Sequence, residues 1–300
     1  MKLRANPRRK MYFCFMKSDA SNFKSSIFSS VNCRGKLLDL SAPKLMGILN
    51  LTPDSFSDGG QFFSEKSALL QVEKMHDEGA AIIDIGAQST RPSAKYLTAD
   101  KEISRLGKVI SEIKKRFPEV LISLDTFYAE VVDFGFNEGI DIINDISGGN
   151  FDPKMLESVG KTQLPYILMH NNGTYDSLHE RVIKGDILLE INYYFSKKIE
   201  ELRTFGVKDI ILDPGFGFGK TVAQQHQMIE ESNFFGFGKN PLLIGISRKS
   251  FIYKPLGKSP GAVNEETQKL HLKVLQNGAK ILRVHEVAEA KKTLDDFLNS

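Results

Sequence analysis

Short apolar runs alternate with longer amphipathic stretches from about residue 44 to the end of the chain. Eight of the apolar runs have the length of a strand. Val, Ile and Leu fill them without alternation, as expected when both faces of a strand are buried. The predicted strands span residues 45–49, 81–85, 120–124, 141–144, 166–169, 209–212, 242–246 and 281–284.

A helical stretch follows each predicted strand, at residues 64–78, 99–116, 127–138, 153–159, 184–205, 222–232, 265–277 and 286–298. Strand–helix alternation implies parallel strands joined by right-handed crossovers. Eight such units in ~255 residues have the size of a (β/α)8 TIM barrel, and a doubly wound open sheet is the alternative. The number of units favours the barrel, which is an α/β fold.

Residues 1–32 lack this pattern, and we predict a disordered tail ahead of a single domain over residues 33–300. Lys and Arg are frequent in residues 1–10, and a short apolar run follows at residues 11–16. This run is too short to span a bilayer, and no small-residue cleavage site follows it. The Ser- and Asn-rich stretch beyond it shows no periodicity.

Composition and charge exclude several classes of protein. The apolar content of 41% and the charged content of 26% are ordinary for a globular protein. The 40 basic and 37 acidic side chains nearly cancel, which argues against a nucleic-acid partner. Cys14 and Cys33 provide neither a disulfide framework nor a metal-ligand spacing, and both are predicted to lie outside the core. We therefore expect a cytoplasmic protein without a membrane or nucleic-acid partner.

Polar and charged groups stand at the carboxyl ends of all eight predicted strands. In a barrel of this type, the chemistry lies on that face, where strands pass into loops. Each group alone is compatible with a structural role, for example a turn cap, a helix cap or a core histidine. Together they predict a binding rim made by Asn50, Gln88, Arg91, Asp125, Asn144, His170, Asp213, Lys249, Arg283 and His285.

The loop after the sixth strand, residues 213–220, reads DPGFGFGK. Its glycines permit positive φ and close backbone approach to a ligand, and its two Phe side chains can wall a planar ring. It is not a phosphate-binding P-loop, because Pro214 occupies the place of the first glycine. It also fails the dinucleotide fingerprint, because its third glycine comes one residue early.

The rim groups sort into two chemical sets. The first set consists of hydrogen-bond acceptors and an amide, which suit a planar, nitrogen-rich heterocycle: Asp125, Asn144 and Asp213. Each charge-assisted pair with such a ring contributes roughly 1.5–3 kcal/mol. The second set consists of cationic groups, which suit a phosphate: Arg91, Lys249, Arg283 and His285. Asn50 can ligate a hard cation such as Mg²⁺, which is usually also coordinated by substrate phosphates. The rim is therefore predicted to bind a polar heterocycle that carries a phosphate or diphosphate.

Residues 35–298 resemble the dihydropteroate synthases of folate biosynthesis, which belong to the pterin-binding family. The resemblance rests on ordered motifs at residues 46–60 (MGILNLTPDSFSDGG), 89–92, 123–126, 143–145, 168–170, 212–220, 247–250 and 283–285. It implies a condensation of 6-hydroxymethyl-7,8-dihydropterin diphosphate with p-aminobenzoate, which gives 7,8-dihydropteroate and diphosphate. It also implies a Mg²⁺ cofactor and a homodimer.

The resemblance assigns a role to individual residues. Asp125, Asp213 and Lys249 are implied to be catalytic. The implied pterin contacts are Asp125, Asn144, Asp213 and Lys249, and the implied diphosphate contacts are Arg91, Arg283 and His285. Phe56, Thr90, Pro92, Phe218 and Ser250 are implied to shape the p-aminobenzoate pocket, which sulfonamides also occupy. Asn50 is implied to bind Mg²⁺.

The chain departs from the family pattern at residues 87–88, where Ala-Gln replaces the common Gly-Glu, and at Ser93 and Glu286. Three alternatives remain open at this point. A pterin-binding methyltransferase that uses methyltetrahydrofolate shares the pterin contacts but does not need the motif at residues 89–92. A pterin-binding homologue without turnover is the second alternative. The third is an aldolase-like barrel with Lys249 as a Schiff-base nucleophile.

Overall fold

Eight parallel strands form the centre of the computed structural model, which describes residues 30–51, 60–88, 96–174, 177, 182–238 and 240–300. Their order is β8-β7-β6-β5-β4-β3-β10-β9. A parallel bridge between Leu212 and Leu242 joins β8 to β9, so the sheet closes on itself. The strands are β3 (Lys44–Asn50), β4 (Ile82–Gly86), β5 (Leu121–Asp125), β6 (Ile142–Asp145), β7 (Tyr166–Met169), β8 (Ile210–Asp213), β9 (Leu243–Ile244) and β10 (Ile281–Val284).

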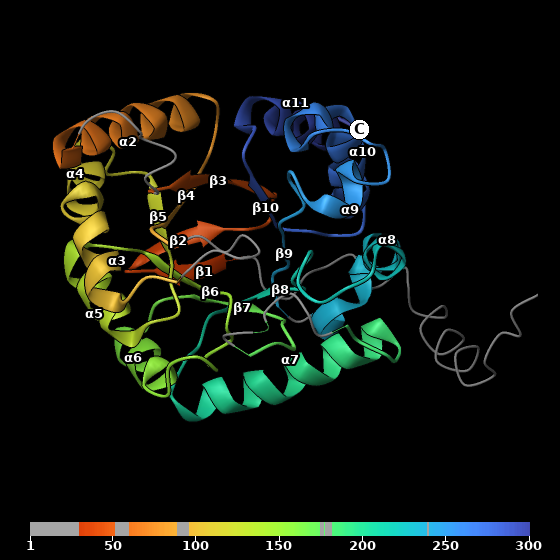
Figure 1. Ribbon diagram of the computed structural model, residues 1–300, viewed down its shortest axis with the longest axis horizontal. Helices are drawn as coiled ribbons and strands as arrows, with labels where there is room; N and C mark the ends of the chain where they lie inside the picture. Colours follow the sequence, from red (N-terminus) through yellow and green to blue (C-terminus); the bar gives the residue numbers. More distant parts are fainter. Residues whose placement is uncertain (1–29, 52–59, 89–95, 175–176, 178–181, 239) are drawn as a thin grey trace, which may run out of the picture.

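Helices surround this barrel, as Figure 1 shows, and the prediction of a (β/α)8 barrel is confirmed. They are α2 (Gly60–Asp77), α3 (Ala99–Leu106), α4 (Val109–Arg116), α5 (Ala129–Glu138), α6 (Met155–Thr162), α7 (Ile187–Thr204), α8 (Val222–Glu230), α9 (Ser250–Tyr253), α10 (Asn264–Gln276) and α11 (Val287–Leu298), with short 3-10 segments η2 (Ser232–Gly238) and η3 (Pro260–Ala262). The single helix predicted over residues 99–116 is instead two helices, because Gly107 takes a φ of 48° and ends α3.

The interior of the barrel contains a layer to which every strand contributes one buried apolar side chain: Met46, Ile82, Leu121, Ile142, Ile167, Ile211, Leu243 and Ile281. These side chains come from the amino-terminal halves of the strands. A second, larger apolar cluster fills the space between the strands and the helices. The amino-terminal half of the barrel interior is therefore a packed apolar core.

A β-hairpin that the sequence did not predict closes the amino-terminal end of the barrel. It consists of β1 (Ser30–Cys33) and β2 (Lys36–Asp39), joined through residues 34 and 35 at positive φ. Val31, Cys33, Leu38 and Leu40 complete the interior apolar layer. The expectation that Cys33 lies outside the core is therefore wrong. Since β1 includes residues 30–32, which were predicted as tail, the domain begins no later than Ser30.

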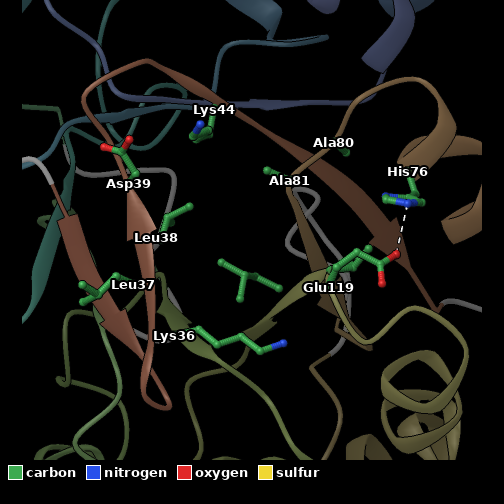
Figure 2. A pocket seen from close by; sticks show the side chains of 11 residues that line it. Lys36, Leu37, Leu38, Asp39, Lys44, His76, Ala80, Ala81 and Glu119 are labelled. Carbon is green, nitrogen blue, oxygen red and sulfur yellow. Dashed lines mark ion pairs between the residues drawn. The ribbon is translucent and has the colours of Figure 1, made fainter.

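A cavity of about 350 Å³ lies between this hairpin and the first residues of β3, β4 and β5 (Figure 2). His76 and Glu119 form an ion pair of 3.1 Å on its wall. Lys36 Nζ donates to the carbonyl of Pro118 at 2.7 Å. The cavity opens at the end of the barrel opposite the predicted rim. In the part of the chain that the structure describes, no helix is long and apolar enough to cross a membrane.

Candidate functional site

The strand register brings predicted rim residues into one row. Asn50 lies opposite Gly86, Gly86 lies opposite Asp125, and Asp125 lies opposite Asn144 in the adjacent pairs of strands. Asn50 is exposed, Asp125 is half-buried and Asn144 is buried. Three groups from separate parts of the chain thus occupy neighbouring positions at the carboxyl-terminal end of the barrel.

Asp84 lies beneath this row, and the sequence analysis did not predict it as a site residue. Its side chain on β4 is fully buried. It accepts hydrogen bonds from Ser123 Oγ at 2.7 Å and from Asn144 Nδ2 at 3.0 and 3.2 Å. It also accepts from Arg283 Nε at 2.6 Å. The sequence feature that could have identified Asp84 is a single carboxylate in the middle of an apolar strand. The sequence analysis considered only polar residues at strand ends.

Arg283 links Asp84 to the rim. Besides its bond to Asp84, its Nη2 donates to Asp125 at 2.9 Å. Burial and the charge of Asp84 together raise the pKa of Asp125 to about 7, although the guanidinium of Arg283 acts in the opposite direction. One guanidinium therefore holds two carboxylates, and one of these titrates near neutral pH.

Asp213 stands at the end of β8 and begins the glycine-rich loop. Its Oδ1 accepts the Gly215 N–H at 2.7 Å. Burial raises the pKa of Asp213, whereas the Gly215 N–H and the charges of Lys249 and Arg283 act in the opposite direction. The loop glycines have positive φ values, as predicted, and a Cβ at Gly215 would lie 2.1 Å from the carbonyl oxygen of His170. Only glycine fits this close approach.

Lys220 fixes the shape of this loop from inside the protein. Its ammonium donates to the carbonyls of Gly215 at 2.8 Å, Phe218 at 3.0 Å and His170 at 3.4 Å. Gln225 accepts the Gly217 N–H at 2.8 Å. Burial lowers the pKa of Lys220 to about 7. The loop is therefore tied both to β7 and to the start of α8 before any ligand binds.

Lys249, which follows the adjacent strand β9, contacts the same loop. Its Nζ lies 4.6 Å from the centre of the Phe218 ring. Burial and the nearby Arg283 lower the pKa of Lys249 to about 8, against the attraction of Asp213 and Asp125. Phe218 is buried in a small aromatic and apolar cluster. Ser250 follows directly as the half-buried first residue of α9.

His285 is oriented by its neighbours. The hydroxyl of Ser247 donates to Glu286 Oε2 at 3.0 Å and lies 3.1 Å from His285 Nδ1. Because Ser247 has one hydroxyl proton, its bond with His285 requires the ring proton on Nδ1. Glu286 in turn accepts from Arg248 Nε at 2.6 Å. The imidazole is thus oriented through its Nδ1 beside the end of β10.

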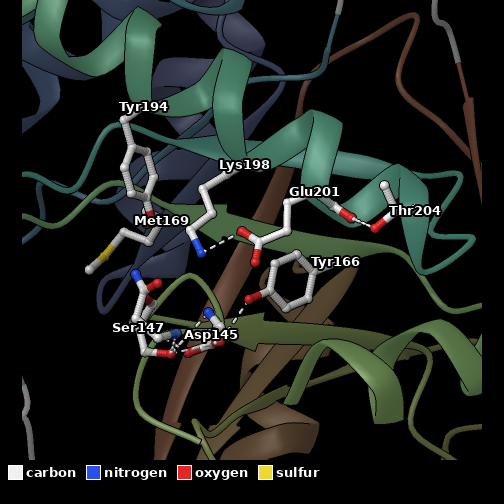
Figure 3. Close-up of polar contacts among 10 residues, drawn as sticks. Asp145, Ser147, Tyr166, Met169, Tyr194, Lys198, Glu201 and Thr204 are labelled. Atoms are coloured by element: carbon white, nitrogen blue, oxygen red, sulfur yellow. Dashed lines mark hydrogen bonds and ion pairs between the residues drawn. The ribbon is translucent and has the colours of Figure 1, made fainter. Parts of the chain in front are cut away.

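Two strand-end residues serve the core rather than the rim. His170 is buried, and its ring contacts Tyr194 edge to face at 4.8 Å. Burial lowers its pKa well below the usual range, so the ring is neutral. Asp145 accepts from Ser147, Gly149 and Tyr166, the last at 2.7 Å, in the network that Figure 3 shows. The prediction that His170 lines the rim is therefore wrong.

Gln88 also points inward. Its Nε2 donates to Glu102 Oε2 at 2.9 Å, and its Oε1 accepts the Leu97 N–H at 3.0 Å. This side chain therefore anchors residue 97 to the end of β4. The remaining predicted site residues lie outside the described residues: Phe56, Thr90, Arg91 and Pro92.

The fold and the rim define a (β/α)8-barrel enzyme with a buried carboxylate–guanidinium–lysine cluster at its carboxyl-terminal end. Residues 46–285 match the family described as pterin binding enzymes. The chain is 41% identical over 261 residues to the dihydropteroate synthase of Haemophilus influenzae, which covers 86% of this chain and 94% of that protein. The chain therefore belongs to the dihydropteroate synthase family of pterin-binding enzymes.

Solved structures show the same relationship. A Yersinia pestis dihydropteroate synthase in complex with a sulfonamide drug is 36% identical, with a TM-score of 0.84 over 90% of this chain and 98% of that chain. A Xanthomonas albilineans dihydropteroate synthase with 4-aminobenzoic acid is 32% identical, with a TM-score of 0.83 over 90% of this chain and 97% of that chain.

Proposed function

We propose that this protein condenses 6-hydroxymethyl-7,8-dihydropterin diphosphate with p-aminobenzoate, releasing 7,8-dihydropteroate and diphosphate. The observation that carries the proposal is the cluster in which Arg283 joins Asp84 and Asp125, with Asn144 alongside. Its acceptor groups match the N–H donors of a pterin ring, and its cationic groups match a diphosphate.

Asp125, Asn144 and Asp213 are assigned to the pterin ring. Buried carboxylates pair well with an amino-pyrimidinone edge, because the ring offers adjacent N–H donors and the site excludes water. Lys249 is assigned to the acceptor side of the ring. Its lowered pKa, about 8, leaves it mostly protonated at neutral pH and able to donate. Phe218, beside Lys249, supports the pocket wall.

Arg91, Arg283 and His285 are assigned to the diphosphate. The contact of 3.1 Å between Ser247 Oγ and His285 Nδ1 supports this role, since it orients the imidazole. Asn50 would hold Mg²⁺: it is an exposed oxygen donor at the end of β3. Mg²⁺ usually keeps several waters and needs few protein ligands. When bound, Mg²⁺ would neutralise charge on the leaving diphosphate.

In the chemical step, the bond between the pterin methylene carbon and the diphosphate oxygen breaks, and its electron pair leaves with the diphosphate. Positive charge then develops on the methylene and spreads into the ring. Asp125 and Asp213 stabilise this charge electrostatically. The amine nitrogen of p-aminobenzoate forms the new C–N bond and loses a proton to the solvent. Phe56, Thr90, Pro92, Phe218 and Ser250 are assigned to the p-aminobenzoate pocket, which sulfonamides would also occupy.

A product assay tests this function. The purified protein should convert the pterin diphosphate and p-aminobenzoate to dihydropteroate in the presence of Mg²⁺, and omission of either substrate should abolish the product. A sulfonamide should compete with p-aminobenzoate but not with the pterin. Methyl transfer from methyltetrahydrofolate without dihydropteroate formation would instead support the methyltransferase alternative. Pterin binding without any product would support a homologue without turnover.

The assembly and compartment are part of the same proposal. We expect a homodimer, as the family resemblance implies, and a cytoplasmic location. Leu189 and Tyr193, exposed one turn apart on α7, offer an apolar surface for a second copy of the chain. Sedimentation at micromolar concentration should give twice the mass of the chain, and cell fractionation tests the compartment.

A further inference from the structure

Asp84 belongs to the cluster that carries the proposed function, yet no contact with either substrate is assigned to it. Its two oxygens accept from Ser123, Asn144 and Arg283 on three other strands, at distances from 2.6 to 3.2 Å. Its side chain has no contact with solvent. A buried carboxylate of this kind fixes the groups around it, because an ionised carboxylate only accepts hydrogen bonds.

The first consequence concerns the Asn144 amide. Its Nδ2 lies 3.0 and 3.2 Å from the two Asp84 oxygens. The reversed amide would place Oδ1 against the carboxylate, which is repulsive, so Asp84 determines which end of the amide faces inward. Oδ1 is consequently turned away from Asp84. Asn144 is thereby set as a hydrogen-bond acceptor toward the rim.

The second consequence concerns the Arg283 guanidinium. Nε binds Asp84 at 2.6 Å and Nη2 binds Asp125 at 2.9 Å. Two contacts on different nitrogens fix the plane of the guanidinium, and this plane also holds Asp125. Without Asp84, the guanidinium keeps only one of these restraints.

We propose that Asp84 is a positioning residue that sets the hydrogen-bonding pattern of the pterin half of the site, through the Asn144 amide and the Arg283 guanidinium. Asp84 itself does not touch the ligand. The inference rests on the proposed function, since it assigns the heterocycle to this half of the rim. It predicts selective damage to pterin binding, whereas a purely structural carboxylate would affect both substrates through stability alone.

Asp145 provides a matched control. It is a buried carboxylate on β6, one strand beyond β5, and it accepts from Ser147 N at 2.7 Å, Ser147 Oγ at 2.9 Å, Gly149 N at 2.8 Å and Tyr166 Oη at 2.7 Å. None of these partners belongs to the cluster around Arg283. Asp84→Asn and Asp145→Asn therefore each remove one buried carboxylate that accepts four hydrogen bonds. Only the Asp84 network includes the rim groups Asn144 and Arg283.

The test measures, for both variants and the wild type, the Kd of 6-hydroxymethyl-7,8-dihydropterin without diphosphate, the KM for p-aminobenzoate and the melting temperature. Asp84→Asn should raise the pterin Kd on the order of ten- to a hundredfold, as expected for charge-assisted contacts. Its KM for p-aminobenzoate should stay within about twofold of wild type. Asp145→Asn should lower the melting temperature but keep the pterin Kd within about threefold.

Two results overturn the inference: an unchanged pterin Kd in Asp84→Asn, or an equal rise in Kd in Asp145→Asn. If Asp84→Asn does not fold, Ser123→Ala decides, because it removes one bond that fixes Asp84 and keeps the charge. It should raise the pterin Kd roughly threefold, and no change would reject the inference. Because the pterin Kd is measured without turnover, the inference fails separately from the proposed function, which fails if the wild type forms no dihydropteroate.

Discussion

Replacing Arg283 with alanine should damage more than diphosphate binding. In the wild type this guanidinium is the charged partner of both Asp84 and Asp125, at 2.6 and 2.9 Å. The variant leaves two carboxylates close together inside the barrel without their counter-charge. Burial of unpaired charge is strongly unfavourable, so one of them must take up a proton or admit water.

The expected loss of unfolding free energy in Arg283→Ala can be worked out from the exposure of Arg283 and Asp125. Removing one partner of a buried ion pair costs about 3–5 kcal/mol. The Arg283 side chain is 21% exposed and Asp125 17%, which places the expected loss of unfolding free energy at the lower end, about 3 kcal/mol. A loss of that size should be evident in a denaturant titration.

The loss should depend on pH with a defined sign. Arg283 lowers the pKa of Asp125, so its removal raises that pKa above the present value of about 7. A carboxyl whose folded pKa exceeds its unfolded value of about 3.9 stabilises the fold at low pH, and this contribution is lost as pH rises through the folded pKa. The variant should therefore be closer to wild type at pH 5 than at pH 8.

Urea unfolding at pH 5 and pH 8 measures the effect, with Arg248→Ala as the control. Arg248 also pairs with a carboxylate, Glu286, but its side chain is 46% exposed, so its removal should cost less than about 1 kcal/mol at either pH. Calorimetry should show weaker binding of both the bare pterin and the pterin diphosphate to Arg283→Ala. A stability loss no larger than in Arg248→Ala, or the same at both pH values, would refute the reasoning.

Further predictions concern other parts of the chain. Asp213→Asn keeps an acceptor for the Gly215 N–H but loses the negative charge. In a rapid-quench assay with saturating substrates, the single-turnover rate of this variant should fall about 10²-fold. An unchanged rate would limit the role of Asp213 to binding. Gln88→Glu sets a second carboxyl against Glu102, whose pKa burial already raises to about 7; urea unfolding should show a loss of about 2 kcal/mol at pH 8 and less at pH 6. Removal of residues 1–29 should leave the melting temperature within about 2 °C, while removal of residues 1–40 should lower it by roughly 10 °C or more, because the hairpin layer is lost.

The strands and the glycine-rich loop could be predicted because their signals are local. Buried parallel strands appear as continuous apolar runs, and Gly215, Gly217 and Gly219 all take the positive φ that their spacing suggested. The register then brought Asn50, Asp125 and Asn144 into one row, as strand ends in a barrel must.

The missed features depend on tertiary contacts. The hairpin strands are four residues each and mix polar with apolar residues, so only their packing against the barrel interior reveals them. The role of Asp84 depends on its contact with Arg283, which lies 199 positions away in the sequence. The two residues meet only because the barrel closes. His170 follows the strand-end pattern of a rim residue, but the packing of Tyr194 places it in the core.

The most direct test of the proposed chemistry is a single-turnover time course in which excess wild-type protein meets the pterin diphosphate and Mg²⁺, with and without p-aminobenzoate. Diphosphate and dihydropteroate are measured in the same quenched samples. The account predicts that both products form in equal amounts when p-aminobenzoate is present. Release of diphosphate without dihydropteroate, or no reaction while both substrates are bound, would contradict the assignment of this rim to the condensation.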